Sequence, residues 1–128
     1  MTRQEVDTLI ALDEKFQDRC SEICDILKEA NPDMRHMDTF VIDTKHVICS
    51  GDVYWGYGGH EHYTGEFPVK YLYMSNNEIQ AIVNEEVRQK EEAEERNRKR
   101  IEAEELAKYQ ELKAKYEGRS RFMYEFEL

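Results

Sequence analysis

The stretch from Arg88 to Arg100 most constrains what this chain can fold into, because Ala93 is its only apolar residue. A helix normally packs into a domain through an apolar stripe, and this stretch has none. Acidic residues instead precede basic residues by four positions, as Glu95 precedes Lys99. Each such pair stabilises an isolated helix by about 0.2–0.5 kcal/mol. We therefore predict a solvated helix held by ion pairs.

A longer helix surrounds this stretch. Ser75 and Glu78 have the spacing of a capping box, which satisfies the first amides of a helix, so the helix is predicted to open there. Gly118 is the residue type that commonly follows a last helical turn. We therefore predict a helix over residues 75–117, which either extends in one piece or breaks near Asn97. The predicted ion pairs are Glu86–Lys90, Glu92–Arg96, Glu94–Arg98, Glu95–Lys99, Glu104–Lys108 and Glu111–Lys115.

The long helix carries two separate apolar stripes. The first lies in its opening turns and is expected to dock on the rest of the fold; it comprises Ile79, Ile82, Val83 and Val87. The second follows the charged stretch and comprises Ile101, Leu106, Tyr109, Leu112 and Tyr116. No other segment supplies a partner for the second stripe. We therefore expect a homodimer in which two copies pair through a short coiled-coil seam.

A second helix is predicted at the N-terminus, where Thr2 and Glu5 form another capping box. Apolar residues then recur at spacings of three and four, as one face of an amphipathic helix requires. They are Leu9, Leu12, Phe16, Cys20, Ile23 and Leu27, with Val6, Ile10 and Ile26 beside them. The helix is expected to stop before Pro32, because the residue before a proline avoids the helical conformation.

The middle of the chain changes to the pattern of β-strands. Residues 39–43 are rich in β-branched side chains, and a two-residue turn separates them from a second such run that starts at residue 46. The second strand is expected to continue to residue 57 with a bulge at Gly51. Residues 60–67 return after a turn at two consecutive glycines. We therefore predict a three-stranded antiparallel sheet.

These elements define an α+β fold: an N-terminal helix packed on a small antiparallel three-stranded sheet, followed by a long charged C-terminal helix. The expected division is residues 1–74 for the helix and sheet, residues 75–117 for the long helix and residues 118–128 for a tail. The end of the tail alternates apolar and polar residues, which fits an added edge strand. A disordered end is an equal alternative, because chain termini fray unless they are tied down.

The chain is acidic, with 28 acidic and 18 basic residues and a formal net charge of −10. The imbalance is greatest in residues 1–33, which hold nine acidic and four basic residues. Such a surface repels nucleic acid and anionic membranes and suits a protein partner with a basic surface. Net charge can also serve solubility alone. The acidic candidates for partner binding are Asp13, Asp18 and Glu22 on the predicted N-terminal helix.

Three cysteines, no signal peptide and no long apolar run indicate a reduced, cytoplasmic setting. Cys20 and Cys24 lie four positions apart on the apolar face of the predicted helix. We interpret them as buried small hydrophobic residues, with a redox pair or a thiolate metal site as the alternative.

No residue pattern predicts an enzyme, and we expect no cofactor. His60 and His62 would point to one face of a strand and could share a metal, but the spacing fixes no further ligand. The glycines of residues 56–59 lack the lysine and the following helix of a phosphate-binding loop, so a hairpin turn explains them. Cys49 and Ser50 alternate to opposite faces, which disfavours a nucleophile site beside a histidine.

Aromatic residues are concentrated in the middle of the chain, with seven of them in residues 54–73. On a small sheet, some must pack in the core, while alternation sends others outward. Tyr and Trp are favoured in protein interfaces because they bury a large area and keep a polar tip. A pocket for a base or nucleotide is the remaining alternative. The candidates for a partner surface are Tyr54, Trp55, Tyr57 and Tyr63.

The run YWGYGGHE at residues 54–61, the run FPVKYL at residues 67–72 and the charged helix after them resemble small proteins typical of phage genomes. The resemblance covers roughly residues 38–115. Proteins of this kind include inhibitors of host defence, among them anti-CRISPR proteins. The resemblance implies a partner-binding role and no catalytic residue.

We therefore expect a non-enzymatic, phage-encoded inhibitor or adaptor that binds a basic groove on a host defence protein that handles nucleic acid, in the host cytoplasm. A structural or assembly protein that dimerises through its long helix is one alternative. A binder of a nucleotide signal, with the aromatic and glycine-rich region as its pocket, is the other.

Overall fold

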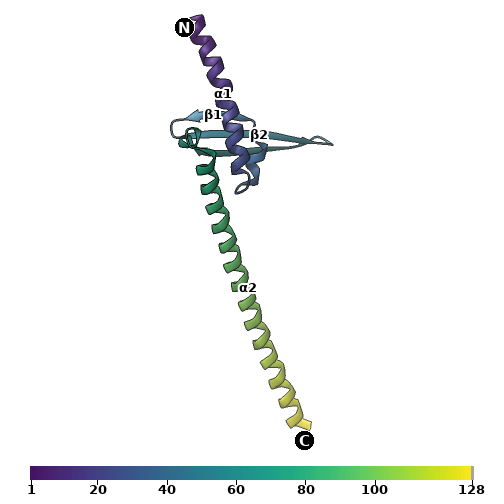
Figure 1. Cartoon of the computed structure of the whole chain (residues 1–128). Helices are drawn as coiled ribbons and strands as arrows, with labels where there is room; N and C mark the ends of the chain where they lie inside the picture. Colours follow the sequence, from purple (N-terminus) through teal and green to yellow (C-terminus); the bar gives the residue numbers. More distant parts are fainter. Residues whose placement is uncertain (128) are drawn as a thin grey trace. The chain divides into compact units, whose positions relative to one another are not determined.

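The computed structural model describes residues 1–127 of the chain, with side chains described for residues 1–118. The elements are α1 (Arg3–Leu27), the 3-10 helix η1 (Pro32–His36), β1 (Thr39–Asp43), β2 (His46–Trp55), β3 (Gly59–Pro68), the 3-10 helix η2 (Val69–Leu72) and α2 (Asn76–Glu127) (Figure 1). The fold is α+β, as predicted, with an N-terminal helix, a three-stranded antiparallel sheet and a long C-terminal helix.

The chain divides into two compact units, residues 1–87 and residues 88–128. Every buried residue of the described chain lies in the first unit. In the second unit, every residue from Arg88 to Gly118 is exposed. The boundary between the units falls later than the predicted boundary at Ser75, because Ile79 and Val83 in the opening turns of α2 complete the core of the first unit.

The capping box at the start of α1 is confirmed. The Glu5 amide donates to Thr2 Oγ1, and the Thr2 amide donates to Glu5 Oε1, each at 3.1 Å. The second half of α1 packs into the core, where Cys20, Ile23 and Cys24 are buried. The first half of the helix lies beyond the sheet (Figure 1). Its apolar residues stay exposed, so the predicted stripe is a core contact only in the second half of α1.

The sheet has the order β1-β2-β3, with antiparallel pairing on both sides of β2. β1 pairs only with the first half of β2, so β2 and β3 continue as a two-stranded ribbon from Gly51 and Tyr63 to the turn (Figure 1). The register is uniform along the ribbon, so the predicted bulge at Gly51 is wrong. Glycine is needed there for a different reason, since a Cβ atom would lie 1.7 Å from the carbonyl oxygen of His36.

The core lies between one face of the sheet and the helices. It contains Cys20, Ile23 and Cys24 of α1, Met34 of η1, Phe40, Val47, Cys49 and Phe67 of the sheet, Tyr71 of η2, and Ile79 and Val83 of α2. Arg19 ties α1 to the segment that leads into α2. Its guanidinium donates to the carbonyl oxygens of Tyr71 at 3.2 Å, Leu72 at 3.3 Å and Met74 at 2.6 Å.

α2 begins at Asn76, immediately after the predicted cap, and the Glu78 amide donates to Ser75 Oγ at 3.2 Å. The helix continues past Asn97 without a break. It also continues past Gly118, so the predicted stop there is wrong, and residues 118–127 are helical in place of an edge strand or a disordered end. A glycine costs only about 1 kcal/mol inside a helix, and the arginines that follow it are good helix formers. Leu128 lies outside the described residues.

Ion pairs line the exposed part of α2. The predicted pair Glu95–Lys99 forms, with 3.5 Å between nitrogen and oxygen. The structure also pairs Arg88 with Glu92, Arg98 with Glu95, and Arg100 with Glu104. All of these groups are exposed, so each pair contributes little to stability. None of the described helices combines the length and the apolar composition needed to cross a bilayer.

Candidate functional site

The tip of the β2–β3 ribbon displays three of the four predicted aromatic residues. Tyr54 and Trp55, at the end of β2, have 74% and 54% of their surface in solvent, and Tyr57 in the turn is fully exposed. Tyr57 has a φ of 69°, which is uncommon for a bulky residue. None of the three belongs to the core. The fold therefore exposes a large aromatic surface at the tip of the ribbon, where none of these three side chains packs against the core.

Trp55 is held in place by the residue opposite to it on β3. Trp55 and Gly59 are directly paired, and the indole lies over the backbone of the glycine. A Cβ atom at position 59 would lie 1.8 Å from the indole Nε1, so a larger residue would displace the ring. Covering a strand glycine with an aromatic ring from the neighbouring strand fixes the register of the pair. Trp55 is thus ordered while half of its surface faces solvent.

Asp52 joins two histidines on the exposed face of the same ribbon. Asp52 Oδ1 lies 2.8 Å from Nε2 of His60 and 2.7 Å from Nδ1 of His62. The ring of His60 also stacks on Tyr54, with 4.6 Å between the ring centroids. Hydrogen bonds from His62 and His60 hold the pKa of the Asp52 carboxyl below its usual value. We call these four side chains the ribbon cluster; it orders the strands that carry the exposed aromatics.

The two histidines share one face of the strand, as the sequence predicts, and both are hydrogen-bonded to Asp52. Over the described residues, no group of three or more His, Cys, Asp or Glu side chains is arranged to hold a metal ion. Cys49 is buried in the core, while Ser50 lies on the other face of β2, so the predicted alternation of these two residues is confirmed.

Tyr63, the fourth predicted aromatic residue, packs within the chain. Its ring stacks on His36 with 4.4 Å between centroids, and its hydroxyl donates to Glu61 at 2.8 Å. The hydrogen bond to Glu61 raises the pKa of the Tyr63 hydroxyl. Tyr63 is half-buried and supports the base of the ribbon on the side of η1. It is therefore set apart from the three exposed aromatics at the tip.

The charge of the hairpin formed by β2 and β3 is more one-sided than that of the predicted acidic helix. Residues 46–69 contain no lysine or arginine, and their three acidic residues, Asp52, Glu61 and Glu66, are all exposed. Net charge summed over a longer segment does not show this feature, because a longer segment also includes the basic residues that precede and follow residues 46–69. Aromatic faces attract arginine and lysine cations. Carboxylates beside exposed tyrosine and tryptophan therefore match a surface rich in arginine and lysine.

The predicted acidic residues of α1 are exposed. Asp13 accepts a long hydrogen bond, 3.4 Å, from Gln17, and Glu22 pairs with Arg19 at 2.9 Å. Asp18 is exposed on the same helix. The first half of α1 and the tip of the ribbon extend from the sheet in different directions (Figure 1). Asp13 and the aromatic tip therefore do not form one compact site.

Two further sets of exposed apolar residues stand outside the core. In the first half of α1 they are Val6, Leu9, Ile10 and Leu12. In the second unit they are the predicted self-association residues Ile101, Leu106, Tyr109, Leu112 and Tyr116. The first set was expected in the core because its spacing matches the buried half of the helix. The sheet ends at its edge strand β1, which α1 meets at Gln17, so the residues before Gln17 extend past the sheet (Figure 1).

All three cysteines are buried, as predicted for Cys20 and Cys24. Burial raises the pKa of the Cys20 thiol to about 12. A hydrogen bond between the thiols of Cys24 and Cys49 raises the pKa of the first and lowers that of the second. These thiols sit in the core with hydrophobic neighbours, where the solvent cannot reach them.

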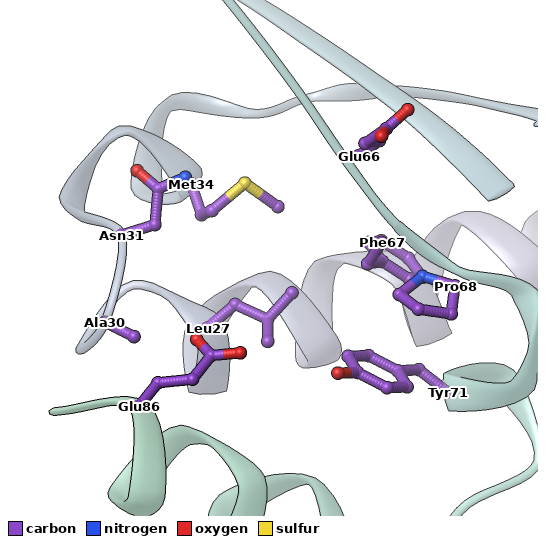
Figure 2. A pocket seen from close by; sticks show the side chains of 9 residues that line it. All are labelled: Leu27, Ala30, Asn31, Met34, Glu66, Phe67, Pro68, Tyr71 and Glu86. Carbon is purple, nitrogen blue, oxygen red and sulfur yellow. The ribbon is translucent and has the colours of Figure 1, made fainter. Parts of the chain in front are cut away.

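A pocket of 170 Å³ opens between the end of α1, η1, β3 and the opening turns of α2 (Figure 2). Its lining residues are Leu27, Ala30, Asn31, Met34, Glu66, Phe67, Pro68, Tyr71 and Glu86. None of the residues predicted to bind a partner is among them. The pocket is smaller than the roughly 300–1,000 Å³ typical of cofactor sites. It was not predicted, because its residues come from three separate parts of the sequence, residues 27–34, residues 66–71 and Glu86.

No protein-family model, curated protein or solved structure matches this chain. The function therefore has to be argued from the surfaces described above.

Proposed function

We propose that this chain is a non-catalytic, protein-binding inhibitor or adaptor whose partner presents a basic surface. The observation that carries the proposal is the ribbon tip, where Tyr54, Trp55 and Tyr57 face solvent on strands without any lysine or arginine. Tyrosine and tryptophan dominate the energetics of protein interfaces because they bury area at low entropic cost. The ribbon cluster behind them holds the arm in one conformation, which lowers the cost of ordering it on binding.

The partner class follows from charge. A groove that binds nucleic acid is lined with lysine and arginine, and it attracts an acidic protein in the same way that it attracts phosphate. The chain carries a net charge of −10 and adds Asp13, Asp18 and Glu22 on α1 as further acidic contacts. The resemblance to phage proteins that block host defence points in the same direction. We propose a host defence protein that handles nucleic acid as the partner.

Affinity capture tests this proposal. The full chain serves as bait in a host lysate at low and high salt, and the captured proteins are identified by mass spectrometry. The test variant carries Tyr54→Ser, Trp55→Ser and Tyr57→Ser. The matched control is Tyr73→Ser, which removes an exposed tyrosine outside the ribbon.

Capture of a nucleic-acid-binding protein at low salt, weaker at high salt because charge drives the encounter, supports the proposal. The triple variant should lose that protein and the Tyr73→Ser control should keep it. An identical set of captured proteins for bait, triple variant and control contradicts the ribbon as the binding surface.

A second candidate function, assembly by self-pairing of α2, is favoured by the exposed stripe of the second unit. In an antiparallel pair with its two-fold axis at Tyr109, Leu106 of one copy faces Leu112 of the other. The same register places Glu105 opposite Lys113 of the second copy. A parallel pair would instead place each of these charges opposite its own copy, which is repulsive. Charge therefore favours the antiparallel arrangement for this candidate.

Light scattering on the purified chain tests the second candidate. We expect a dimer that becomes a monomer when Leu106→Glu and Leu112→Glu are combined. Tyr109→Cys should cross-link two copies under mild oxidation, whereas Leu106→Cys should not, because only the residue at the two-fold axis meets itself. A monomer at high concentration contradicts this candidate and leaves the partner-binding proposal unaffected.

A further inference from the structure

The pocket of Figure 2 has apolar walls and a polar mouth. Leu27 at the end of α1, Met34 of η1 and Phe67 of β3 form the walls. Met34 and Phe67 belong to the core, so these walls are built by packed residues and are not a gap between loose loops. A volume of 170 Å³ holds one amino-acid side chain and excludes a nucleotide.

Tyr71 supplies the first polar group. Its side chain is only 7% exposed, and its ring stacks on Phe67 with 6.1 Å between the ring centroids. The hydroxyl points into the pocket (Figure 2). No described residue forms a hydrogen bond with that hydroxyl. Among the described residues, no buried side-chain nitrogen or oxygen atom lacks a hydrogen-bond partner, so the Tyr71 hydroxyl is reached by solvent through the mouth of the pocket. The hydroxyl is therefore available to a ligand that enters the pocket.

Glu86 supplies the second polar group, from the opening turns of α2. Its carboxylate faces the same space as the Tyr71 hydroxyl (Figure 2). Within residues 1–87, no residue forms an ion pair with Glu86, whose side chain is exposed. Burial and the negative charge of Glu86 together raise the pKa of Tyr71, so the hydroxyl stays protonated. The mouth of the pocket thus offers a carboxylate and a neutral hydroxyl, which select a cation against an anion.

We propose that this pocket binds the side chain of a lysine or arginine from the partner protein. The apolar stem of the side chain lies against Leu27 and Met34, and its cation sits between the Glu86 carboxylate and the Tyr71 hydroxyl oxygen, which accepts one of its hydrogen bonds. Lysine and arginine are the side chains that combine an apolar stem with a charged head. The source of the side chain rests on the proposed function, whereas the chemistry of the pocket does not.

Small-molecule probes test the pocket without a partner. The full chain is titrated with n-butylammonium and, separately, with n-butanol, and NMR follows the methyl groups of Leu27 and Met34. We expect saturable shifts with n-butylammonium and binding about tenfold weaker with n-butanol, because a hydrogen bond with a charged group contributes about 1.5 kcal/mol or more. Equal binding of the two probes, or shifts spread evenly over the chain, overturns the proposal.

Two substitutions test whether the Glu86 carboxylate and the Tyr71 hydroxyl bind the ammonium group. Glu86→Gln should weaken n-butylammonium binding about fivefold, as expected for an ion pair that is partly open to solvent. Tyr71→Phe keeps the packed ring and removes only the hydroxyl, and it should also weaken the ammonium probe while leaving n-butanol unchanged. The matched control is Glu91→Gln, which removes the same charge from an exposed position on the same helix. If Glu91→Gln weakens binding as much as Glu86→Gln, general charge explains the effect and the site is overturned.

The capture experiment separates the pocket from the proposed function. If the pocket takes a side chain of the partner, Glu86→Gln should reduce capture more than Glu91→Gln does. Equal capture by these two variants, with n-butylammonium still bound in the pocket, overturns the partner's lysine or arginine as the occupant. Failure of the ribbon variants to change capture counts against the proposed function and leaves the probe titration as an independent result.

Discussion

The two units of this chain are stabilised by different interactions. Residues 1–87 bury apolar side chains from α1, the sheet and the opening turns of α2 around one core. Residues 88–118 bury nothing and rely on helix propensity and surface ion pairs. Hydrophobic burial contributes far more than exposed ion pairs, at about 25 cal/mol for each Å² of apolar surface removed from water. The first unit should therefore dominate the stability of the chain.

The comparison also separates two kinds of exposed apolar surface. In the first unit, Trp55 is fixed by Gly59 and backed by the ribbon cluster, so its exposure is built into an ordered structure. In the second unit, Leu106 and Leu112 lie on a lone helix that nothing within the described chain covers. An ordered aromatic tip suits recognition of another protein, whereas a bare helical stripe suits pairing with a second helix.

The largest expected difference comes from truncating one large apolar residue in each unit. Phe67→Ala removes a fully packed ring and should destabilise the first unit by about 3–5 kcal/mol. Leu106→Ala, in the second unit, should change the stability of the monomer by less than about 0.5 kcal/mol. Urea unfolding followed by circular dichroism measures both. Similar losses of unfolding free energy in the two variants would contradict the proposed difference between the units.

Arg19 gives the next largest effect. Arg19→Met keeps the apolar stem and removes hydrogen bonds to three carbonyl oxygens before α2, so we expect a loss of about 2–3 kcal/mol. The control, Arg3→Met, changes the same charge at an exposed position and should cost almost nothing. Thermal unfolding compares the two. If both variants melt at the same temperature, the hydrogen bonds from Arg19 to the segment before α2 do not stabilise the first unit.

Gly59→Ala should have a smaller effect on stability and a clear effect on the ribbon. The added Cβ meets the indole of Trp55, which can move at modest cost, so the loss should stay within about 1 kcal/mol. Trp55 is the only tryptophan in the chain, so its fluorescence reports the change directly. Gly56→Ala is the control, because a Cβ atom there meets nothing within 4 Å. Unchanged emission in Gly59→Ala would show that the indole is not held over the glycine.

The smallest effect concerns pH. The pKa of Asp52 is lower in the folded chain than in the unfolded chain, because His62 and His60 donate hydrogen bonds to its carboxylate. Its contribution to stability is therefore present above the ordinary aspartate pKa of about 3.9 and is lost as pH falls through the lowered value. NMR shifts of ribbon amides should follow this loss, and Asp52→Asn should abolish it. The same acid transition in the variant would assign it to another group.

Local features of the fold could be predicted from the sequence, because they depend on neighbouring residues. The Thr2–Glu5 capping box, the hairpin between β1 and β2 and the start of α2 are of this kind. Features that depend on distant residues could not be predicted. Position 51 requires glycine because the carbonyl group of His36 lies where a Cβ atom would be. The pocket that contains Tyr71 and Glu86 forms only when η2 and α2 meet the end of α1.

The candidate site shows the same division. The exposed tip includes Tyr54, Trp55 and Tyr57. Alternation alone would send the neighbours Tyr54 and Trp55 to opposite faces, and both are exposed because the end of the ribbon lies outside the core. The pattern did not separate Tyr63 from them, because its burial depends on a stacking contact with His36 from η1. Nor did the pattern show that the first half of α1 extends past the sheet, which depends on α1 crossing the edge strand β1 at Gln17.

Quenching of Trp55 fluorescence tests the central claim most directly, that the ordered ribbon tip binds a basic protein surface. Acrylamide quenching is measured on the full chain alone and with the captured partner or, as a defined probe, a deca-arginine peptide. We predict that saturating partner or peptide shields Trp55 from acrylamide and that the shielding weakens as salt is raised. Binding that leaves Trp55 as accessible as in the free chain would contradict the claim.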